Sequence, residues 1–427
     1  MSDDLLACRR AIEAVRAGVP NRDAVRALGC SQPHIEERFQ RGLRECRELA
    51  GQGKQARGLL VAGDFGTGKS HLLEYLHHLA LEQNFVSSRV VISKETPLYD
   101  PSKFYRSAID AAVVPGIQGG ALREIAQTLN DTSIHPGYEP FYQRVTSDAS
   151  DLDSRFGATL YIHKHVRIRE LELTDRVISF WSGRKLNVSE IRKALRQLGE
   201  SVTYRLGKIS ERELAHQRFR FASQLMVAAG YSGWVLLVDE AELMGRYSLL
   251  QRARSYAELA RWIGALGEDK VCPSLFTVFA IVPVFERAVI EDKHDRDKVR
   301  ARLEARGAPD DLLLASEAER GMKEIPKAVK LKRLERDQIE AVGGKLQEIH
   351  AKAYQWNPPS IQPPTEGLHS TSMRTHVRTW VNQWDLQRLY PAYQPDIETT
   401  AVEQRFTEDR DLEVSSEQNS GDDDPAA

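Results

Sequence analysis

The sequence predicts an α/β fold in which a parallel sheet is flanked by helices. Two observations support this prediction. Short apolar runs recur along the chain, and each is followed by helix-competent sequence, which favours alternating strands and helices over an all-β fold. A glycine-rich turn follows the first run and leads into an amphipathic segment. The predicted strands are residues 59–62, 89–92, 234–238 and 276–282, with a weaker fifth at 328–331.

The spacing of these strands indicates several domains within the 427 residues. About 140 residues separate the second strand from the third. This is far more than a crossover in a compact sheet needs, so part of the stretch is predicted to be an insertion. The predicted organisation is an N-terminal helical segment at 1–50, a sheet-containing core at 51–134 and 216–335, a basic insertion at 135–215, a helical lid domain at 336–395 and an acidic disordered tail at 396–427.

The helical segments are predicted from the spacing of apolar residues. Residues 4–50 have helical spacing, with a break at "AGVPN". Near the other end, the same spacing is found in "ERDQIEAVGGKLQEIHAKAYQW" and "TSMRTHVRTWVNQWDLQRLY", which are separated by the proline-rich "NPPSIQPPTEG". The tail beyond Pro395 is too acidic and too poor in large apolar residues to fold alone.

Charge is nearly balanced over the chain, with 59 basic and 61 acidic residues, but it is unevenly distributed. From Asp396 onward there are eleven acidic residues and two arginines, a net charge of −9. Because the whole chain carries −2, the rest carries about +7. A mildly basic folded part is compatible with a nucleic-acid partner but does not require one.

Cysteine and histidine spacing gives no metal site. The four cysteines lack metal-ligand spacing and suit a reducing compartment, and the pairs His77-His78 and His163/His165 lack a third ligand. No apolar run reaches the roughly 20 residues that span a bilayer, and the N-terminus lacks a signal-peptide pattern. We therefore expect a cytoplasmic protein with no membrane contact.

The glycine-rich turn matches the pattern G-x-x-x-x-G-K-[ST] without a mismatch. In this pattern backbone N–H groups point at phosphate oxygens, Lys69 neutralises the outer phosphates and the Ser70 hydroxyl ligates Mg²⁺. The helix that follows points its positive end at the same anion. The alternative is a glycine-rich turn with a chance lysine. The predicted ATP-binding residues are Gly63, Asp64, Phe65, Gly66, Thr67, Gly68, Lys69, Ser70 and His71.

A second signal is the acidic pair Asp239-Glu240, which ends the third predicted strand. Ligands bind at the carboxyl ends of strands in such sheets. Asp239 is predicted to hold Mg²⁺, and Glu240 to orient and polarise the attacking water. An Asp-Glu pair alone often only marks a strand leaving the core. Together with the phosphate loop, it favours ATP hydrolysis, with Glu240 and Lys69 as catalytic residues, over mere nucleotide storage.

With both motifs present, the chain resembles ATPases of the ASCE and AAA+ kind, of the origin-recognition type. It also resembles the ATP-binding proteins of bacterial BREX phage-exclusion systems, particularly the BrxD type, over about residues 9–393. The segments that carry this resemblance are "RRAIEAVRAGVPNRDAVRALG", "GDFGTGKSHLLEYL", "VVISKETPLYDPSKFY" and "SYAELARW". The resemblance implies an ATPase that acts beside a DNA methyltransferase and other defence proteins, as a homo-oligomer or in a hetero-complex.

The resemblance also implies positions for regulatory arginines. Arg374 lies where related ATPases place a sensor arginine that reaches the γ-phosphate from the same subunit. The alternative is a solvated helix arginine. An arginine supplied to a neighbouring subunit cannot be assigned from the sequence, and the candidates are Arg296, Arg300, Arg302 and Arg306.

One feature expected from the resemblance is missing. The fourth predicted strand, "LFTVFAIVP", ends without the Asn, Ser or Thr that positions the hydrolytic water in this class. Thr277 lies too early on the strand to replace it. Hydrolysis is therefore expected to be slow or to depend on a partner.

Two regions could contact nucleic acid. In "RDAVRALGCSQPHIEERFQ" the spacing fits a helix-turn-helix, with Gln32–Arg38 entering a major groove. Because this segment directly precedes the first strand, where this ATPase class covers the adenine with helices, we favour that structural role.

The second region is the basic insertion. From Tyr161 to Arg220 there are fourteen Lys/Arg and seven Asp/Glu residues. Arg192, Lys193 and Arg196 are predicted to lie on one helix capped by Ser189. Contact with double-stranded DNA through these residues is one interpretation. A solvated basic helix, or docking of an acidic protein partner, fits equally well. The aromatic residues among the charges are Phe180, Trp181 and Tyr204.

The sequence thus favours an ATP-binding and ATP-hydrolysing component of a BREX defence system that couples nucleotide state to DNA or partner proteins. One alternative is a slowly hydrolysing, nucleotide-gated scaffold. Another is a replication-type DNA loader, which would share the core fold.

Overall fold

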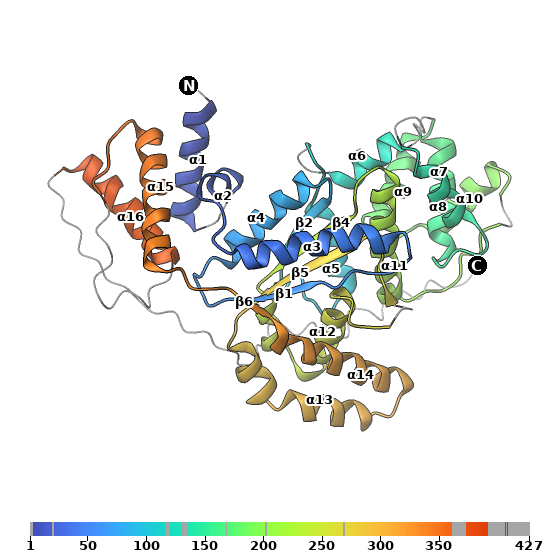
Figure 1. The fold of residues 1–427 in the computed structure, drawn as a ribbon. Helices are drawn as coiled ribbons and strands as arrows, with labels where there is room; N and C mark the ends of the chain where they lie inside the picture. Colours follow the sequence, from blue (N-terminus) through green and yellow to red (C-terminus); the bar gives the residue numbers. More distant parts are fainter. Residues whose placement is uncertain are drawn as a thin grey trace.

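A computed structural model describes residues 3–18, 21–116, 120–129, 135–167, 169–200, 203–267, 270–360, 373–391, 406 and 408. Its centre is a six-stranded sheet with the strand order β3-β2-β4-β5-β1-β6 (Figure 1). All neighbouring strands are parallel except β2 and β3, which pair antiparallel. The strands are β1 (Leu59–Ala62), β2 (Val86–Val91), β3 (Ala112–Val113), β4 (Trp234–Asp239), β5 (Leu275–Ile281) and β6 (Val329–Lys330).

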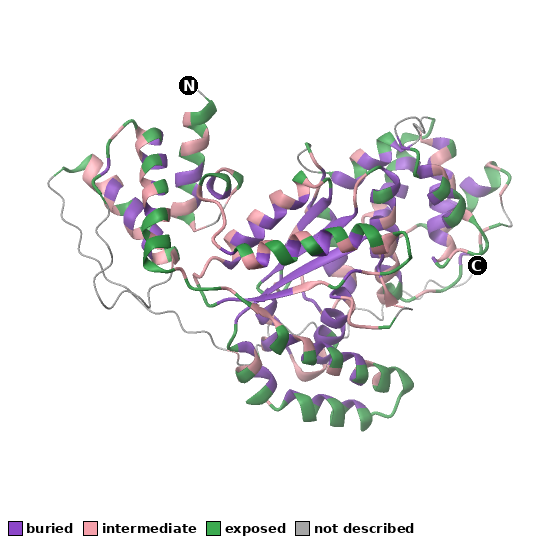
Figure 2. Ribbon diagram, viewed as in Figure 1, coloured by how far each residue is buried: buried purple, intermediate pink, exposed green. Residues whose placement is uncertain are grey.

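The predicted α/β class and its five strands are confirmed, with shifts of up to three residues at their ends. Strands β4 and β5 are buried along their whole length, as expected of central strands covered on both faces. The two-residue edge strand β3 was not predicted, because so short a segment produces no apolar pattern. Figure 2 shows the buried residues concentrated on the strands and on the inward faces of the helices.

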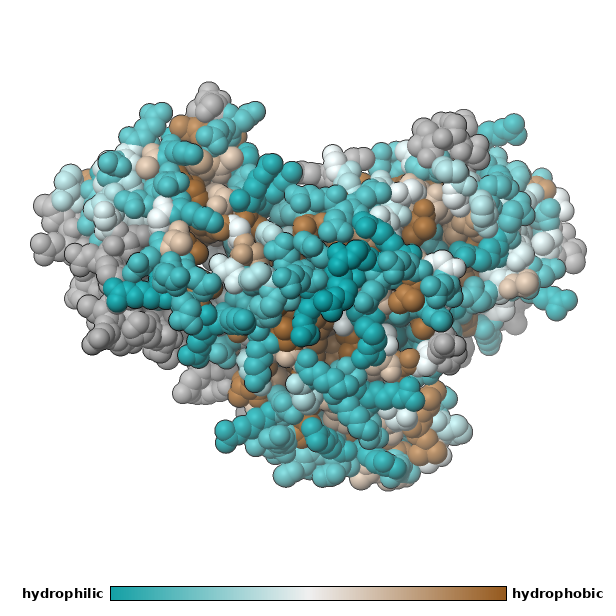
Figure 3. Space-filling view, in the orientation of Figure 1, coloured by the Kyte–Doolittle hydropathy of each residue, from teal (hydrophilic) through white to brown (hydrophobic). Residues whose placement is uncertain are grey.

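Helices cover both faces of the sheet. On one face, α3 (Pro33–Ala50) and α4 (Lys69–Glu82) form an apolar layer with β1, β4 and β5, in which Phe39 meets Phe276 edge to face at 5.7 Å. The other face is covered by α5 (Pro101–Asp110), α11 (Glu211–Ala228) and α12 (Leu249–Trp262). The outer side of α3 is hydrophilic (Figure 3).

The predicted insertion is helical and shares the apolar core of the second face. Its helices and the one before it are α6 (Ala121–Thr128), α7 (Tyr138–Thr146), α8 (Ser154–Val166), α9 (Leu171–Trp181) and α10 (Val188–Gln197). The predicted cap of α10 is wrong: the N-cap is Asn187, whose side chain accepts from Glu190 N, and not Ser189. Phe180 and Trp181 have no exposed surface, so they build the core and are not available for stacking on bases.

A helical hairpin projects from the lower part of Figure 1. It follows the sheet strand β5 and consists of α13 (Asp295–Glu304) and α14 (Pro309–Glu324), and α14 packs on α12. Short helical turns connect these elements, namely η1 (Ala241–Arg246), η3 (Glu286–Glu291) and η4 (Ile325–Lys327).

A separate apolar cluster joins both ends of the described chain. It is built by α1 (Asp3–Ala17), α2 (Arg22–Leu28), α15 (Arg336–Tyr354) and α16 (Met373–Leu389). Arg16 pairs with Asp385 at 2.5 Å, and Asp385 also contacts the buried His350 at 3.1 Å. The first two helices therefore pack with the predicted lid helices (left in Figure 1), whereas α3 packs on the sheet.

No helix among the described residues is long and apolar enough to cross a bilayer. Part of the proline-rich segment between α15 and α16 lies outside the described residues. The predicted acidic tail also lies outside them, apart from Phe406 and Glu408.

Candidate nucleotide-binding site

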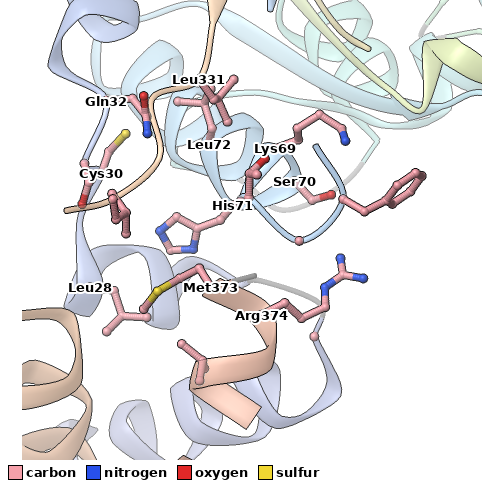
Figure 4. Close-up of a pocket in the computed structure, with 18 of the residues that line it drawn as sticks. Leu28, Cys30, Gln32, Lys69, Ser70, His71, Leu72, Leu331, Met373 and Arg374 are labelled. Atoms are coloured by element: carbon pink, nitrogen blue, oxygen red, sulfur yellow. The ribbon is translucent and has the colours of Figure 1, made fainter. Parts of the chain in front are cut away.

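A cavity opens where the loop after β1, the end of β4 and the N- and C-terminal helices meet (Figure 4). The predicted phosphate loop and the predicted acidic pair both line it, although about 170 residues separate them in the sequence. The lining residues at the phosphate end are Phe65, Gly66, Thr67, Gly68, Lys69, Ser70, Asp239, Glu240, Glu242 and Arg374.

The loop after β1 has the backbone geometry of a phosphate cradle. Gly66 and Gly68 have φ angles of 70° and 97°, in the left-handed region that favours glycine. Helix α4 begins at Lys69, and no side chain caps its N-terminus. Its first N–H groups are therefore available to an anion, which the helix dipole also attracts. Strand, turn and helix follow each other as the phosphate-loop pattern requires.

Lys69 is held inside this loop. Its ammonium group donates to the carbonyl oxygens of Gly63 at 2.8 Å and Asp64 at 3.3 Å. The side chain is only 8% exposed, and this burial lowers its pKa, an effect that nearby carboxylates oppose, Glu242 most strongly. The amine thus lies within the glycine-rich loop, at the end of the cavity where Asp239, Glu240 and Glu242 also lie.

The acidic pair is turned toward the cavity by a local backbone constraint. Asp239 is buried at the end of β4, and its Oδ1 accepts a hydrogen bond from Glu240 N at 3.0 Å. Glu240 has a φ of 56°, and its side chain is accessible to solvent. The surrounding protein and the neighbouring Asp239 raise the pKa of Glu240. Such a carboxylate suits proton transfer or orientation of a water molecule.

The donor set fits a Mg²⁺ ion bound together with a nucleotide. Ser70 and Asp239 both line the cavity. Mg²⁺ in nucleotide sites takes one or two protein ligands, with phosphate oxygens and waters completing the shell. Within the described part of the chain, no group of three His, Cys, Asp or Glu side chains could hold a metal without such help.

Glu242 is a site residue that the sequence analysis missed. It is 1% exposed, and its Oε1 lies 4.0 Å from the Lys69 ammonium. Its Oε2 accepts no hydrogen bond from any described residue, and burial raises its pKa to about 7. The third acid in "DEAE" could have signalled it, because a residue two positions after Glu240 can face the same site.

The opposite wall of the cavity is formed by the turn between α2 and α3. His71, in the first turn of α4, contacts the carbonyl oxygen of Gly29 through Nε2 at 2.8 Å and occupies the middle of the view in Figure 4. Gln32 is 6% exposed and makes two hydrogen bonds with the backbone of Lys332, at 2.8 and 3.0 Å. The start of the Gln32–Arg38 segment is therefore buried, which favours the structural role over insertion into a DNA groove.

Arg374 reaches the same loop from α16. Its backbone N–H donates to Gly66 O at 3.3 Å, and its guanidinium points toward the phosphate loop (Figure 4). Of the four candidates for an arginine supplied to another subunit, three pair within this chain. These pairs are Arg296 with Glu286, Arg300 with Glu304, and Arg306 with Asp311. For Arg302 there is no ion pair with a described residue.

Strand β5 contributes no described residue to the lining of the cavity. Thr277 is fully buried, and its hydroxyl donates to Trp262 O at 2.8 Å. It therefore cannot replace the polar residue that the sequence lacks at the end of this strand.

The predicted DNA-contact residues lie in another part of the molecule, on α10 (right in Figure 1). Arg192, Lys193 and Arg196 are all exposed. The two arginines reach only backbone carbonyl oxygens, at 3.4 Å, and none of the three forms an ion pair with a described residue. Their charges are thus available to an external anion.

Comparison with known proteins identifies the family. The family described as "BREX system ATP-binding protein BrxC/D" matches residues 7–132 and 206–366, about two thirds of the chain. The region between the two matches contains α7, α8, α9 and α10. No curated protein and no solved structure matches significantly. The matched ranges include the phosphate loop and the acidic residues after β4, and the chain belongs to the BrxC/D family of ATP-binding components of BREX systems.

Proposed function

We propose that this chain binds Mg·ATP in the described cavity and hydrolyses it, as an AAA+-like ATPase of the BrxD type. The observation that carries the proposal is the meeting of the Gly63–Ser70 loop and the Asp239-Glu240 pair at one cavity. A loop that can cradle phosphates, next to carboxylates at the end of a parallel strand, is the arrangement that phosphoryl transfer to water requires.

Each of the site residues has a defined part in this reaction. The amides of the loop and Lys69 hold the phosphates, while Ser70 and Asp239 supply protein ligands for the metal. Bound Mg²⁺ would neutralise charge on the phosphate oxygens. Glu240 orients and polarises the attacking water. Arg374 offsets charge on the outer phosphate and connects α16 to the nucleotide.

Nucleotide binding is proposed to control engagement of DNA or partner proteins. Helices α1, α2 and α16 line the cavity together with the phosphate loop. A bound nucleotide would therefore contact both the sheet-containing core and the apolar cluster of α1, α2, α15 and α16, and could bias their relative position. The exposed cations of α10 are the proposed duplex-DNA contact. Other BREX proteins, or further copies of this chain, are the proposed protein partners.

A second candidate function is a nucleotide-gated scaffold that hydrolyses ATP rarely. The observation in its favour is the engagement of Thr277 with Trp262 O, which leaves β5 without a polar side chain at the cavity. Without a polar residue on β5, the proposed orientation of the water depends on Glu240, which lines the cavity.

ATP turnover measured with and without duplex DNA separates the two functions. The proteins to compare are the wild type, Glu240→Gln, Lys69→Ala and, as a control, Glu37→Gln on the exposed side of α3. The ATPase proposal expects turnover that DNA stimulates, that falls by about a hundredfold or more in Glu240→Gln, and that is lost with nucleotide binding in Lys69→Ala. Near-zero turnover in the wild type with tightly retained ATP supports the scaffold. Absence of any nucleotide affinity refutes both.

A further inference from the structure

The two described residues of the acidic tail, Phe406 and Glu408, both contact the core. Phe406 is half-buried, and its ring meets that of Phe285 edge to face, with a centroid distance of 6.2 Å. The Cδ1 atom of Phe406 lies 3.1 Å from the position that a Cβ on Gly245 would occupy. Atoms of Val289 and Phe285 lie at 2.7 and 3.0 Å from the same position, so the ring of Phe406 is the third side chain packed against this glycine. Two residues further along, Glu408 pairs with Arg252 at 2.7 Å.

Arg252 is fixed by buried partners so that one edge faces Glu408. Its side chain is 3% exposed, and its Nε and Nη2 donate to the two carboxylate oxygens of Asp295, at 2.7 and 2.8 Å. Asp295 has no exposed surface and also accepts from the hydroxyl of Tyr256 at 2.7 Å. The remaining Nη1 donates to Tyr247 O and to Glu408. A guanidinium that is already held in place loses little entropy when it binds a carboxylate.

A second cation lies beside this position. The Lys293 ammonium donates to Gly245 O at 2.9 Å. Burial and the nearby Arg252 lower the pKa of Lys293, whereas Glu408 acts in the opposite direction. An incoming acidic group therefore offsets repulsion between two cations. The net charge of −9 on the tail from Asp396 complements this basic position.

We propose that Gly245, Arg252, Phe285 and Lys293 form a docking surface for a short peptide of the pattern aromatic-x-acidic, and that the chain's own Phe406 and Glu408 occupy it. The glycine and Phe285 receive the aromatic ring, and the two cations receive the acid. The pattern in the sequence is Phe-Thr-Glu.

The docking surface is connected to the nucleotide site through η1. Gly245 and Glu242 both belong to this six-residue turn, which directly follows Asp239-Glu240. In this proposal a ring packed against Gly245 adds to the contacts of Val289 and Phe285 and further restricts η1, and with it the carboxylate of Glu242 beside Lys69. Because that carboxylate competes with phosphate for the lysine, an occupied docking surface weakens nucleotide binding.

Peptide binding tests the docking surface in the full-length protein. The probe is a fluorescent peptide of residues 400–412, "TAVEQRFTEDRDL", titrated in an anisotropy assay. In the wild type the tethered tail competes with the probe, so a variant with Phe406→Ala and Glu408→Lys should bind it at least about tenfold more tightly. The same probe carrying Phe406→Ala should bind that variant at least about tenfold more weakly. Glu417→Lys, a charge change of the same size elsewhere in the tail, should behave like the wild type.

Equal binding of the probe to the wild type and the double variant, or no binding to either, overturns the proposal. The coupling to the nucleotide site has a separate readout, the affinity for a fluorescent ADP analogue, which does not depend on hydrolysis. The double variant should bind the analogue at least about threefold more tightly, and saturating peptide should restore the wild-type affinity. If neither the double variant nor the added peptide alters the affinity for the ADP analogue, the coupling is refuted.

Discussion

The ammonium of Lys69 lies 4.0 Å from Oε1 of Glu242, and both side chains are buried. They come from the phosphate loop and from the turn after β4, so this contact joins the two motifs that define the site. The second carboxylate oxygen of Glu242 has no partner among the described residues. An incompletely partnered buried carboxylate destabilises the fold when it ionises, and such groups are typical of functional sites.

Replacing Glu242 by Gln should therefore stabilise the protein at neutral and higher pH. Burial raises the pKa of Glu242 from 4.5 to about 7. A carboxyl group whose folded pKa is raised disfavours folding increasingly as pH rises from the unfolded to the folded value. The gain in unfolding free energy for Glu242→Gln should thus grow between pH 4.5 and 7. We expect it to reach about 1–3 kcal/mol, a range that already allows for the loss of the ionic partner of Lys69.

Urea unfolding at pH 5, 7 and 8 without nucleotide measures this gain. Glu37→Gln, an exposed change on α3, is the control and should alter stability by less than about 0.5 kcal/mol at each pH. A Glu242→Gln protein that is less stable than the wild type at pH 8, or a gain that does not depend on pH, contradicts the assigned environment of this carboxyl group.

Asp239→Asn should remove the effect of Mg²⁺ on nucleotide affinity. The amide keeps an oxygen that can accept from Glu240 N, so the turn is retained, while the charge that attracts the cation is lost. The Kd for ATP should rise about tenfold or more with Mg²⁺ and change less than about threefold in EDTA. Isothermal titration under both conditions measures this, with Glu37→Gln again as the control. Equal weakening under both conditions would show that Asp239 supports the fold of the loop instead of binding metal.

Arg374→Gln should reduce turnover more than nucleotide binding. The guanidinium points toward the phosphate loop, where it can offset charge that develops on the outer phosphate. We expect kcat to fall about tenfold or more and the Kd for ATP to change less than about threefold. Arg378→Gln, an exposed change one turn further along α16, is the matched control. If both variants lose the same activity, the effect belongs to α16 as a whole.

The fold could be predicted largely from the sequence because its central strands β4 and β5 are short runs of almost entirely apolar residues. Val235 and Val238 of β4 have no exposed surface, and such strands have few alternative placements. The packing of α1 against α15 and α16 could not be predicted, because it joins residues more than 300 positions apart. One such contact is the ion pair between Arg16 of α1 and Asp385 of α16. Helical spacing reveals an apolar face but not its partner.

In the candidate site, too, local patterns could be predicted from the sequence, whereas contacts that depend on the folded chain could not. The phosphate loop and Asp239-Glu240 could be proposed as parts of one site because each is a local pattern with a known geometry, and both line the cavity. Glu242 was missed because its burial depends on the Glu240 turn, whose φ of 56° is not encoded by a glycine. The contact of Phe406 with Gly245 was missed because composition alone assigned the whole tail to disorder.

The cations of α10 give a prediction that separates phosphate contacts from general charge. Arg192, Lys193 and Arg196 are exposed and form no ion pair with a described residue. If each neutralises one DNA phosphate, replacing all three by Gln should reduce the slope of log K against log salt by about 2–3. Duplex binding measured by fluorescence anisotropy at several salt concentrations gives this slope.

The matched control removes three exposed cations from a different helix, namely Arg296, Lys298 and Arg302 of α13. It changes the net charge by the same amount, so any general electrostatic attraction falls equally in both variants. The slope of log K against log salt should fall further in the α10 variant than in the α13 variant, because the cations of α10 are the ones proposed to contact the phosphates. If the two variants have the same slope, α10 does not contact DNA, and its free charges then fit the docking of an acidic protein partner.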